Sequence, residues 1–165
     1  MQVKEQLDTA VGELMWNIVE LHTQFEEIHK SWAQLLGITE PQWLILMAMN
    51  ELDDRRGISS TAIANNSRIH PAYVAIQTKQ LEKLGFLTRE TPLDEAGSLR
   101  VTLTEGARAK LRKLSAKRQA LSSTMLDGFD EEAVRHLNKR LNLLAKNSRL
   151  ASQKLSIGAG NAVPC

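Results

Sequence analysis

Residues 58–108 constrain the fold of this chain more than any other stretch of its sequence. A short polar helix is expected over residues 60–65 and a turn over residues 66–70, followed by a second helix from Pro71 to a stop at Gly85. Proline suits the first position of a helix because it has no amide proton to lose there and its φ angle already matches the helix. The segment therefore predicts two short helices joined by a turn.

Two strand-like runs, residues 86–91 and 98–103, follow these helices and are joined by the turn-forming sequence PLDEAG. Another helix is expected to begin at Thr104. Helix, turn, helix and β-hairpin is the order of a winged helix-turn-helix, in which the second helix enters the major groove of DNA and the hairpin reaches toward a neighbouring groove or the backbone. The expected fold class is mainly α with a small β-hairpin wing.

The second helix has two chemically different faces. Its packed face is expected from four residues at helical spacing: Val74, Thr78, Leu81 and Leu84. The opposite face is small, amide and basic, with Tyr73 and Gln77 on its flank, which suits an approach to base edges and phosphates. An ordinary solvated helix face is the alternative. The expected DNA-binding residues are Ser67, Arg68, His70, Ala72, Tyr73, Ile76, Gln77, Lys79, Gln80, Arg89 and Arg100.

The charge of the chain is unevenly distributed. Residues 1–65 hold 4 Lys and Arg against 10 Asp and Glu, a net charge of −6, whereas residues 66–118 hold 11 against 5, a net charge of +6. The basic segment coincides with the proposed recognition helix, the wing and the helix after it. Local basicity of this kind supplies the non-specific, salt-sensitive part of DNA affinity. The alternative is that the basic residues of the helix after the wing only solvate it.

Long helices are expected on both sides of the winged unit, and their apolar stripes predict a dimer. A small winged domain cannot cover three such stripes, whereas pairing of the terminal helices of two copies would do so and would set two recognition helices about one DNA turn apart. A monomeric helical bundle is the alternative. The N-terminal stripe, on a helix ending at Gly37, is Leu7, Val11, Leu14, Ile18, Leu21, Phe25, Ile28, Trp32 and Leu35. The C-terminal stripe, on a helix capped by Asp130, is Val134, Leu137, Leu141, Leu144, Ala151 and Leu155, with Ser148 as its one polar member. The third stripe, on the helix between them from Thr104 to Leu126, is Ala107, Leu111, Leu114 and Leu121.

The order of these segments predicts four parts. Residues 1–36 form an N-terminal dimerisation helix, and residues 37–104 form the winged lobe. Within that lobe, Thr39 and Gln42 fit a capping box that opens a largely apolar, buried helix. Residues 105–155 supply C-terminal helices, the first of them reaching Leu126, that complete the dimer interface, and residues 156–165 are a flexible tail.

Three stretches of the chain resemble the MarR (multiple antibiotic resistance regulator) family of transcription factors: LGITEPQWLILMAM, ISSTAIANNSRIHPAYVAIQTKQLEKLGFLTRE and RVTLTEGARAKL. The resemblance implies a homodimer with paired terminal helices that binds a pseudo-palindromic operator in double-stranded DNA. It also implies repression of genes that a small ligand relieves. The sequence departs from the family at the wing tip, where Gly97 stands at the position of a common arginine and Arg100 follows in the next strand. In the recognition helix, Ile76 could meet a thymine methyl group and Gln77 or Gln80 could pair with adenine edges, which would favour an operator rich in A·T pairs.

In such dimers the ligand site lies where the DNA-binding lobe meets the helical region. Aromatic and apolar walls with a convergent polar group suit a small aromatic carboxylate or phenol. The alternative reading makes the tryptophans core residues and the histidines interfacial or exposed. The expected ligand-binding residues are Trp16, His22, His29, Trp32, Trp43 and Met47.

Several other classes of protein are not expected. The sequence has no nucleophile elbow, no glycine loop for phosphates and no His/Glu metal motif, so we expect neither an enzyme nor a cofactor or metal. It has one cysteine, Cys165, and no signal peptide or membrane-spanning run, which predicts a cytoplasmic protein. Two alternatives stay open beside a ligand-released repressor: a ligand-independent repressor, and a helical module that uses the winged fold to bind protein.

Overall fold

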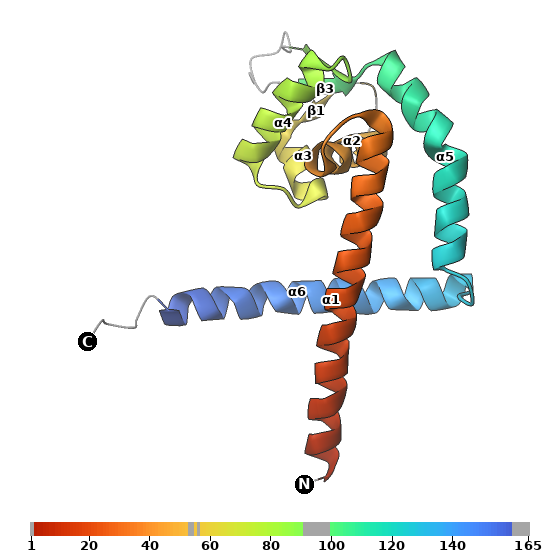
Figure 1. The fold of residues 1–165 in the computed structure, drawn as a ribbon. Helices are drawn as coiled ribbons and strands as arrows, with labels where there is room; N and C mark the ends of the chain where they lie inside the picture. Colours follow the sequence, from red (N-terminus) through yellow and green to blue (C-terminus); the bar gives the residue numbers. More distant parts are fainter. Residues whose placement is uncertain (1, 53–54, 56, 91–99, 160–165) are drawn as a thin grey trace. The chain divides into compact units, whose positions relative to one another are not determined.

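The computed structural model describes residues 2–52, 55, 57–90 and 100–159. Their elements are α1 (Gln2–Leu36), α2 (Glu40–Leu52), β1 (Ile58–Ser59), α3 (Ser60–Ser67), α4 (Pro71–Lys83), β2 (Leu87–Glu90), β3 (Arg100–Leu103), α5 (Glu105–Met125) and α6 (Glu131–Ala159) (Figure 1). The chain divides into two compact units, Met1–Ser115 and Ala116–Cys165, so the boundary falls within α5. No helix in the described part of the chain is long and apolar enough to cross a membrane.

In the first unit, α1 is one continuous helix that meets the winged lobe only near its C-terminal end (Figure 1). It stops at Gly37, as predicted, where a φ of 68° is a left-handed conformation that glycine adopts without steric cost. The side chain of Ala33 is buried, and those of Trp32 and Leu36 pack against the core of the lobe. The part of the apolar stripe between Val11 and Phe25 remains largely exposed within the chain, with Val11, Leu14 and Leu21 each more than 40% accessible.

The helix α2 forms the centre of the lobe. Its capping box is present in part, because the backbone N–H of Thr39 donates to Oε1 of Gln42 over 3.0 Å. Its apolar residues are turned inward, and Ile45, Leu46 and Met49 have no accessible surface. The prediction of a buried helix that begins at this box is therefore confirmed.

The helices α3 and α4 follow as a helix-turn-helix, and the wing is a three-stranded antiparallel sheet in the order β1-β3-β2. The register pairs Leu87 with Leu103 in the hairpin, and Ile58 with Val101 across to β1. The two predicted strands are present, although Thr91, Ser98 and the PLDEAG turn with Gly97 lie outside the described residues. The strand β1 was not predicted, because two residues are too few to show an alternating pattern. The expected fold class, mainly α with a small β wing, is confirmed.

The two helices after the wing begin where the sequence indicated. Oγ1 of Thr104 accepts from the backbone N–H of Ala107 at the start of α5, and a carboxylate oxygen of Asp130 accepts from that of Ala133 at the start of α6. The helix α6 runs to Ala159, so the prediction that a flexible tail begins at residue 156 is wrong for its first four residues. The remaining residues of that tail, 160–165, lie outside the described part.

Candidate nucleic-acid interface

The recognition helix α4 is fixed in the lobe by one buried face and by caps at both ends. Val74, Thr78 and Leu81 are buried, as predicted. At the N-terminus, Nδ1 of His70 accepts from the backbone N–H of Ala72 over 3.3 Å. At the C-terminus, the N–H of Phe86 donates to the carbonyl of Leu81 over 2.9 Å, which is a bond of the Schellman motif that ends many helices.

Leu84 does not belong to the buried face, and the prediction that it packs on the domain is wrong. It is 52% exposed. It is the C-cap residue of α4, and its ψ of 0° turns the chain out of the helix directly after it, so no further turn of α4 packs this side chain onto the lobe. The Schellman motif ends α4 one residue earlier than the apolar pattern indicates.

The outer face of α4 is available to a partner. It is small at its N-terminal end, aromatic and aliphatic in its middle and basic toward its C-terminal end, which allows the helix to approach a groove closely. Tyr73 is 44% and Ile76 is 53% exposed. The exposed residues of α4 are Pro71, Ala72, Tyr73, Ala75, Ile76, Lys79, Gln80 and Lys83.

Gln77 is not among them, and its expected position on the flank of the outer face is wrong. It is 6% exposed, and its Oε1 accepts from Nε2 of Gln42 on α2 over 3.0 Å. The same Nε2 donates to Oε1 of the exposed Gln80 over 2.9 Å. Gln42, itself 3% exposed, was expected only as part of the capping box. The sequence gives no sign of the bond between Gln42 and Gln77, because the two residues are 35 positions apart.

The turn between α3 and α4 carries one cation in a special conformation. Arg68 is exposed and has a φ of 60°, a left-handed value that costs a side-chain-bearing residue steric strain. Ser67, one residue before it, donates its hydroxyl to the carbonyl of Ile63 over 2.8 Å, so this hydroxyl serves to finish α3. A strained, exposed arginine at the C-terminal end of α3, in the turn before the recognition helix, is well placed for a phosphate.

The two wing arginines are held by the lobe itself. Nε of Arg89 lies 2.6 Å from a carboxylate oxygen of Glu82 on α4, and the side chain is only 19% exposed. Nη1 of Arg100 donates to the carbonyl of Gly57 over 3.0 Å. A Cβ on Gly57 would lie 2.9 Å from Cβ of Arg100, so only glycine allows this approach. Both cations therefore brace the wing, which leaves Arg68 and Lys79 as the more accessible of the four Lys and Arg residues among the expected DNA-binding residues.

The basic residues of α5 also divide between inner and outer positions. Nζ of Lys110 lies 4.4 Å from the ring centroid of Phe86, a cation–π contact that joins α5 to the end of α4. Arg108 pairs with Glu105 at 3.4 Å and is 13% exposed. Arg112 and Lys113 are exposed, in line with the alternative that the basic side of α5 is a solvated surface.

The residues expected at a ligand site do not all meet within one chain. Trp32 and Trp43 stack with ring centroids 5.8 Å apart, and Met47 packs against the same core. Trp16 is 74% exposed and lies on the same continuous α1 as Trp32, so at 1.5 Å per residue the two are about 24 Å apart. The core reading fits Trp43, which is 2% exposed, and does not fit Trp16.

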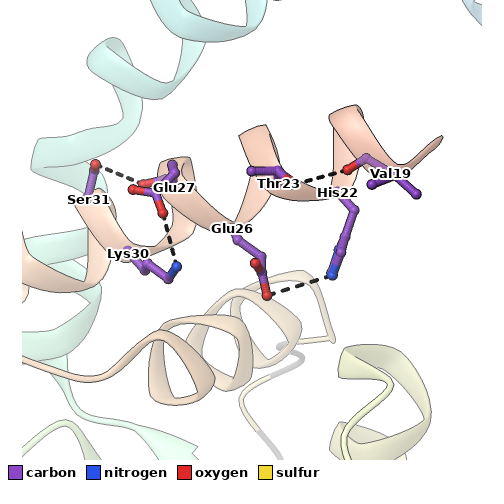
Figure 2. Close-up of polar contacts among 7 residues, drawn as sticks. All are labelled: Val19, His22, Thr23, Glu26, Glu27, Lys30 and Ser31. Atoms are coloured by element: carbon purple, nitrogen blue, oxygen red, sulfur yellow. Dashed lines mark hydrogen bonds and ion pairs between the residues drawn. The ribbon is translucent and has the colours of Figure 1, made fainter. Parts of the chain in front are cut away.

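The two histidines of α1 lie in different environments. Figure 2 shows His22 and Glu26 turned toward each other on the exposed part of α1, with 3.7 Å between Nε2 and the carboxylate. His29 lies nearer the lobe and contacts the ring of Phe25 with 6.1 Å between centroids. Burial lowers the pKa of His29 below its ordinary value, and the nearby carboxylate of Glu40 partly offsets this. His29, and not His22, is therefore the partly buried histidine of α1, three residues before Trp32.

No group of three or more His, Cys, Asp or Glu residues in the described ranges could hold a metal ion. The part of α1 in Figure 2 is instead a solvated polar surface, in which Nζ of Lys30 donates to Glu27 over 3.0 Å and the hydroxyl of Thr23 donates to the carbonyl of Val19 over 3.1 Å.

Comparison with known proteins agrees with this geometry. A sequence model of the MarR family matches residues 38–95. The structure of the MepR–DNA complex from S. aureus is similar with a TM-score of 0.69 and 13% identity, over 81% of this chain and 94% of that one. A mutant MarR from E. coli complexed with operator DNA has a TM-score of 0.66 and 16% identity, over 80% of this chain and 93% of that one. A MarR/EmrR family transcriptional regulator from Acinetobacter has a TM-score of 0.70 and 17% identity, over 84% and 96%.

Proposed function

We propose that this chain is a MarR-family transcriptional regulator, and that it is a homodimeric repressor released from DNA by a small aromatic carboxylate or phenol. The family consists of transcriptional regulators and not of enzymes. The observation that carries the proposal is the outer face of α4, which exposes small, aromatic and basic side chains while caps at both ends fix the helix. Two of the similar structures named above contain DNA.

The assembly we propose follows the predicted division of the chain. The residues before Gly37 and the helices after Thr104, now extended to Ala159, would form the dimer interface, and residues 37–104 would form the DNA-binding lobe. Two lobes in a symmetric dimer would meet half-sites about 10 base pairs apart in a pseudo-palindromic operator. A repressor of this kind acts where the chromosome is, and we therefore propose a cytoplasmic location.

Loss of the two most accessible cations should weaken DNA binding. We expect Lys79→Ala to lower affinity for every sequence and to reduce the slope of log K against log salt by about 1 per subunit, because one phosphate contact is lost. Arg68→Gly should lower affinity while it stabilises the fold, since glycine relieves the strain at φ 60°. Mobility-shift titrations at two salt concentrations, beside thermal melts, measure both effects.

Lys113→Ala is the matched control, because Lys113 is also an exposed cation but lies on α5, outside the winged lobe. Its salt slope should equal that of the wild type. If all three variants lose the same slope, the basic surface acts as a whole and α4 has no special part. If none does, α4 is not the DNA-reading helix.

The effector site that we propose has fewer residues than the sequence predicted. It consists of Trp32, Trp43, Met47 and His29 at the junction of α1 with α2. A ligand that binds better to a dimer with its wings at the wrong separation would draw the population away from the DNA-bound state, by no more than its differential affinity. A panel of benzoates and phenols can be screened by thermal shift and by DNA release. In Trp16→Phe, quenching of the remaining tryptophan fluorescence should accompany release. A ligand that raises the melting temperature and leaves DNA affinity unchanged would contradict the switch.

A further inference from the structure

Gln42 joins the start of α2 to the recognition helix through three hydrogen bonds. Its Oε1 accepts from the backbone N–H of Thr39 over 3.0 Å. Its Nε2 donates to Oε1 of Gln77 over 3.0 Å and to Oε1 of Gln80 over 2.9 Å. Both hydrogens of this buried amide are therefore used, one on each glutamine of α4.

The direction of these bonds is fixed by the backbone. A primary amide can turn its oxygen and nitrogen either way, but a backbone N–H can only donate. Because Thr39 donates, Gln42 has to turn its oxygen toward Thr39 and its nitrogen toward α4. Gln77 and Gln80 must in turn accept with their oxygens. The capping box of α2 thus sets the orientation of two amides on α4.

Of these two amides, only that of Gln80 is exposed. It lies four residues after Ile76 and eight after Ala72, so the three share one stripe of the outer face. With its oxygen turned inward to the buried Gln42, the group that Gln80 turns outward is its Nε2, a donor. A bidentate contact with adenine needs the oxygen as well. Gln80 could form such a contact only if its oxygen were shared between Gln42 and the base through its second lone pair, or if it left Gln42 with an unpaired, buried N–H.

We propose that Gln42, which lies inside the lobe, determines the base preference of α4 by holding Gln80 as a hydrogen-bond donor. The inference rests on the proposed function, since it requires that α4 reads DNA. The base facing Gln80 should then present acceptors only, which means guanine or the O4 edge of thymine. This replaces the expectation from sequence that Gln77 or Gln80 pairs with adenine.

The substitution Gln42→Glu should reverse the preference. Glutamate is common at this position of a capping box. Its carboxylate still accepts from the backbone N–H of Thr39 and lies at the positive end of the helix dipole. It cannot donate, so Gln77 and Gln80 have to turn their nitrogens toward it. Three N–H donors around the carboxylate favour its ionised form. Gln80 would then present its oxygen to DNA and prefer the exocyclic amino group of adenine or cytosine.

The test begins with selection of a site by the wild-type protein from a random pool of double-stranded DNA, followed by Kd measurements on all single-base variants of that site. One position in each half-site should favour guanine or thymine in the wild type by about tenfold and favour adenine or cytosine by a similar factor in Gln42→Glu. Every other position should keep its preference. In NMR spectra without DNA, one side-chain amide proton of Gln80 should move downfield in the variant, since it then bonds a carboxylate.

Two further variants keep the inference testable if Gln42→Glu is poorly folded. Gln80→Glu presents an acceptor to the outside without a change in the buried site, and it should favour cytosine or adenine at the same position. Gln80→Ala should abolish the preference there, and Gln42→Glu combined with Gln80→Ala should show no reversal. Unchanged base preference in a folded Gln42→Glu, or a reversal that persists without Gln80, overturns the inference while DNA binding stands. A wild-type protein that selects no sequence overturns it together with the proposed function.

Discussion

The substitution Leu141→Glu on α6 is expected to turn the protein from a dimer into a monomer and to remove most of its DNA affinity. Leu141 is 45% exposed within the chain, and Leu137 of the same stripe is 40% exposed. Covering a leucine contributes about 2 kcal/mol. In a symmetric dimer both subunits lose this contribution, so the total loss is about 4 kcal/mol. That loss corresponds to about a thousandfold weaker association. Sedimentation at micromolar concentration should give a single species of the chain mass of 18.4 kDa.

Leu143→Glu is the control, because Leu143 lies on the same helix, is 52% exposed and stands outside the stripe. It should remain dimeric and bind DNA like the wild type. Dissociation in both variants would mean that α6 tolerates no added charge anywhere, and no dissociation in either would mean that the stripe of Leu141 is not an interface. A wild-type protein that is monomeric and still binds DNA would contradict the proposed assembly.

The second large effect is expected in the core of the lobe. Leu81 has no accessible surface, so Leu81→Ala should leave a cavity and lower the free energy of unfolding by about 2–5 kcal/mol. Leu84→Ala, three residues later on the apolar pattern, should cost less than about 1 kcal/mol because Leu84 already lies in solvent. Urea denaturation of both variants gives the two values. Equal losses would mean that Leu84 is covered in solution, as by a second subunit, and dilution of the protein would then lower the stability of the wild type.

Much of the architecture was determined by the sequence alone. Gly37 ends α1, Pro71 opens α4 and Asp130 caps α6, all as predicted. Each of these boundaries depends on a few adjacent residues, because a cap or a positive φ is satisfied within one turn of the chain. The burial of α2 could also be predicted from the sequence, since a helix that is apolar nearly all round has to be covered.

Less of the candidate site could be predicted from the sequence. The outer face of α4 followed from helical spacing, but the burial of Gln77 depends on Gln42, which is distant in the sequence. The sequence does not show that the wing arginines have partners. Arg89 lies against Glu82, and Arg100 of β3 donates to the carbonyl of Gly57, the residue before β1. Two residues of β1 become a strand only because β3 offers them backbone partners.

The difference has one physical cause. Spacing along a helix or strand fixes which side chains share a face, and the sequence determined that much for every long helix of this protein. Whether a polar side chain on such a face is free or occupied depends on a donor or acceptor that another segment brings within about 3 Å, as Gln42 does for Gln77 and Gln80. Only the tertiary structure decided those contacts, because the pairing groups approach each other when the core closes around them and not before.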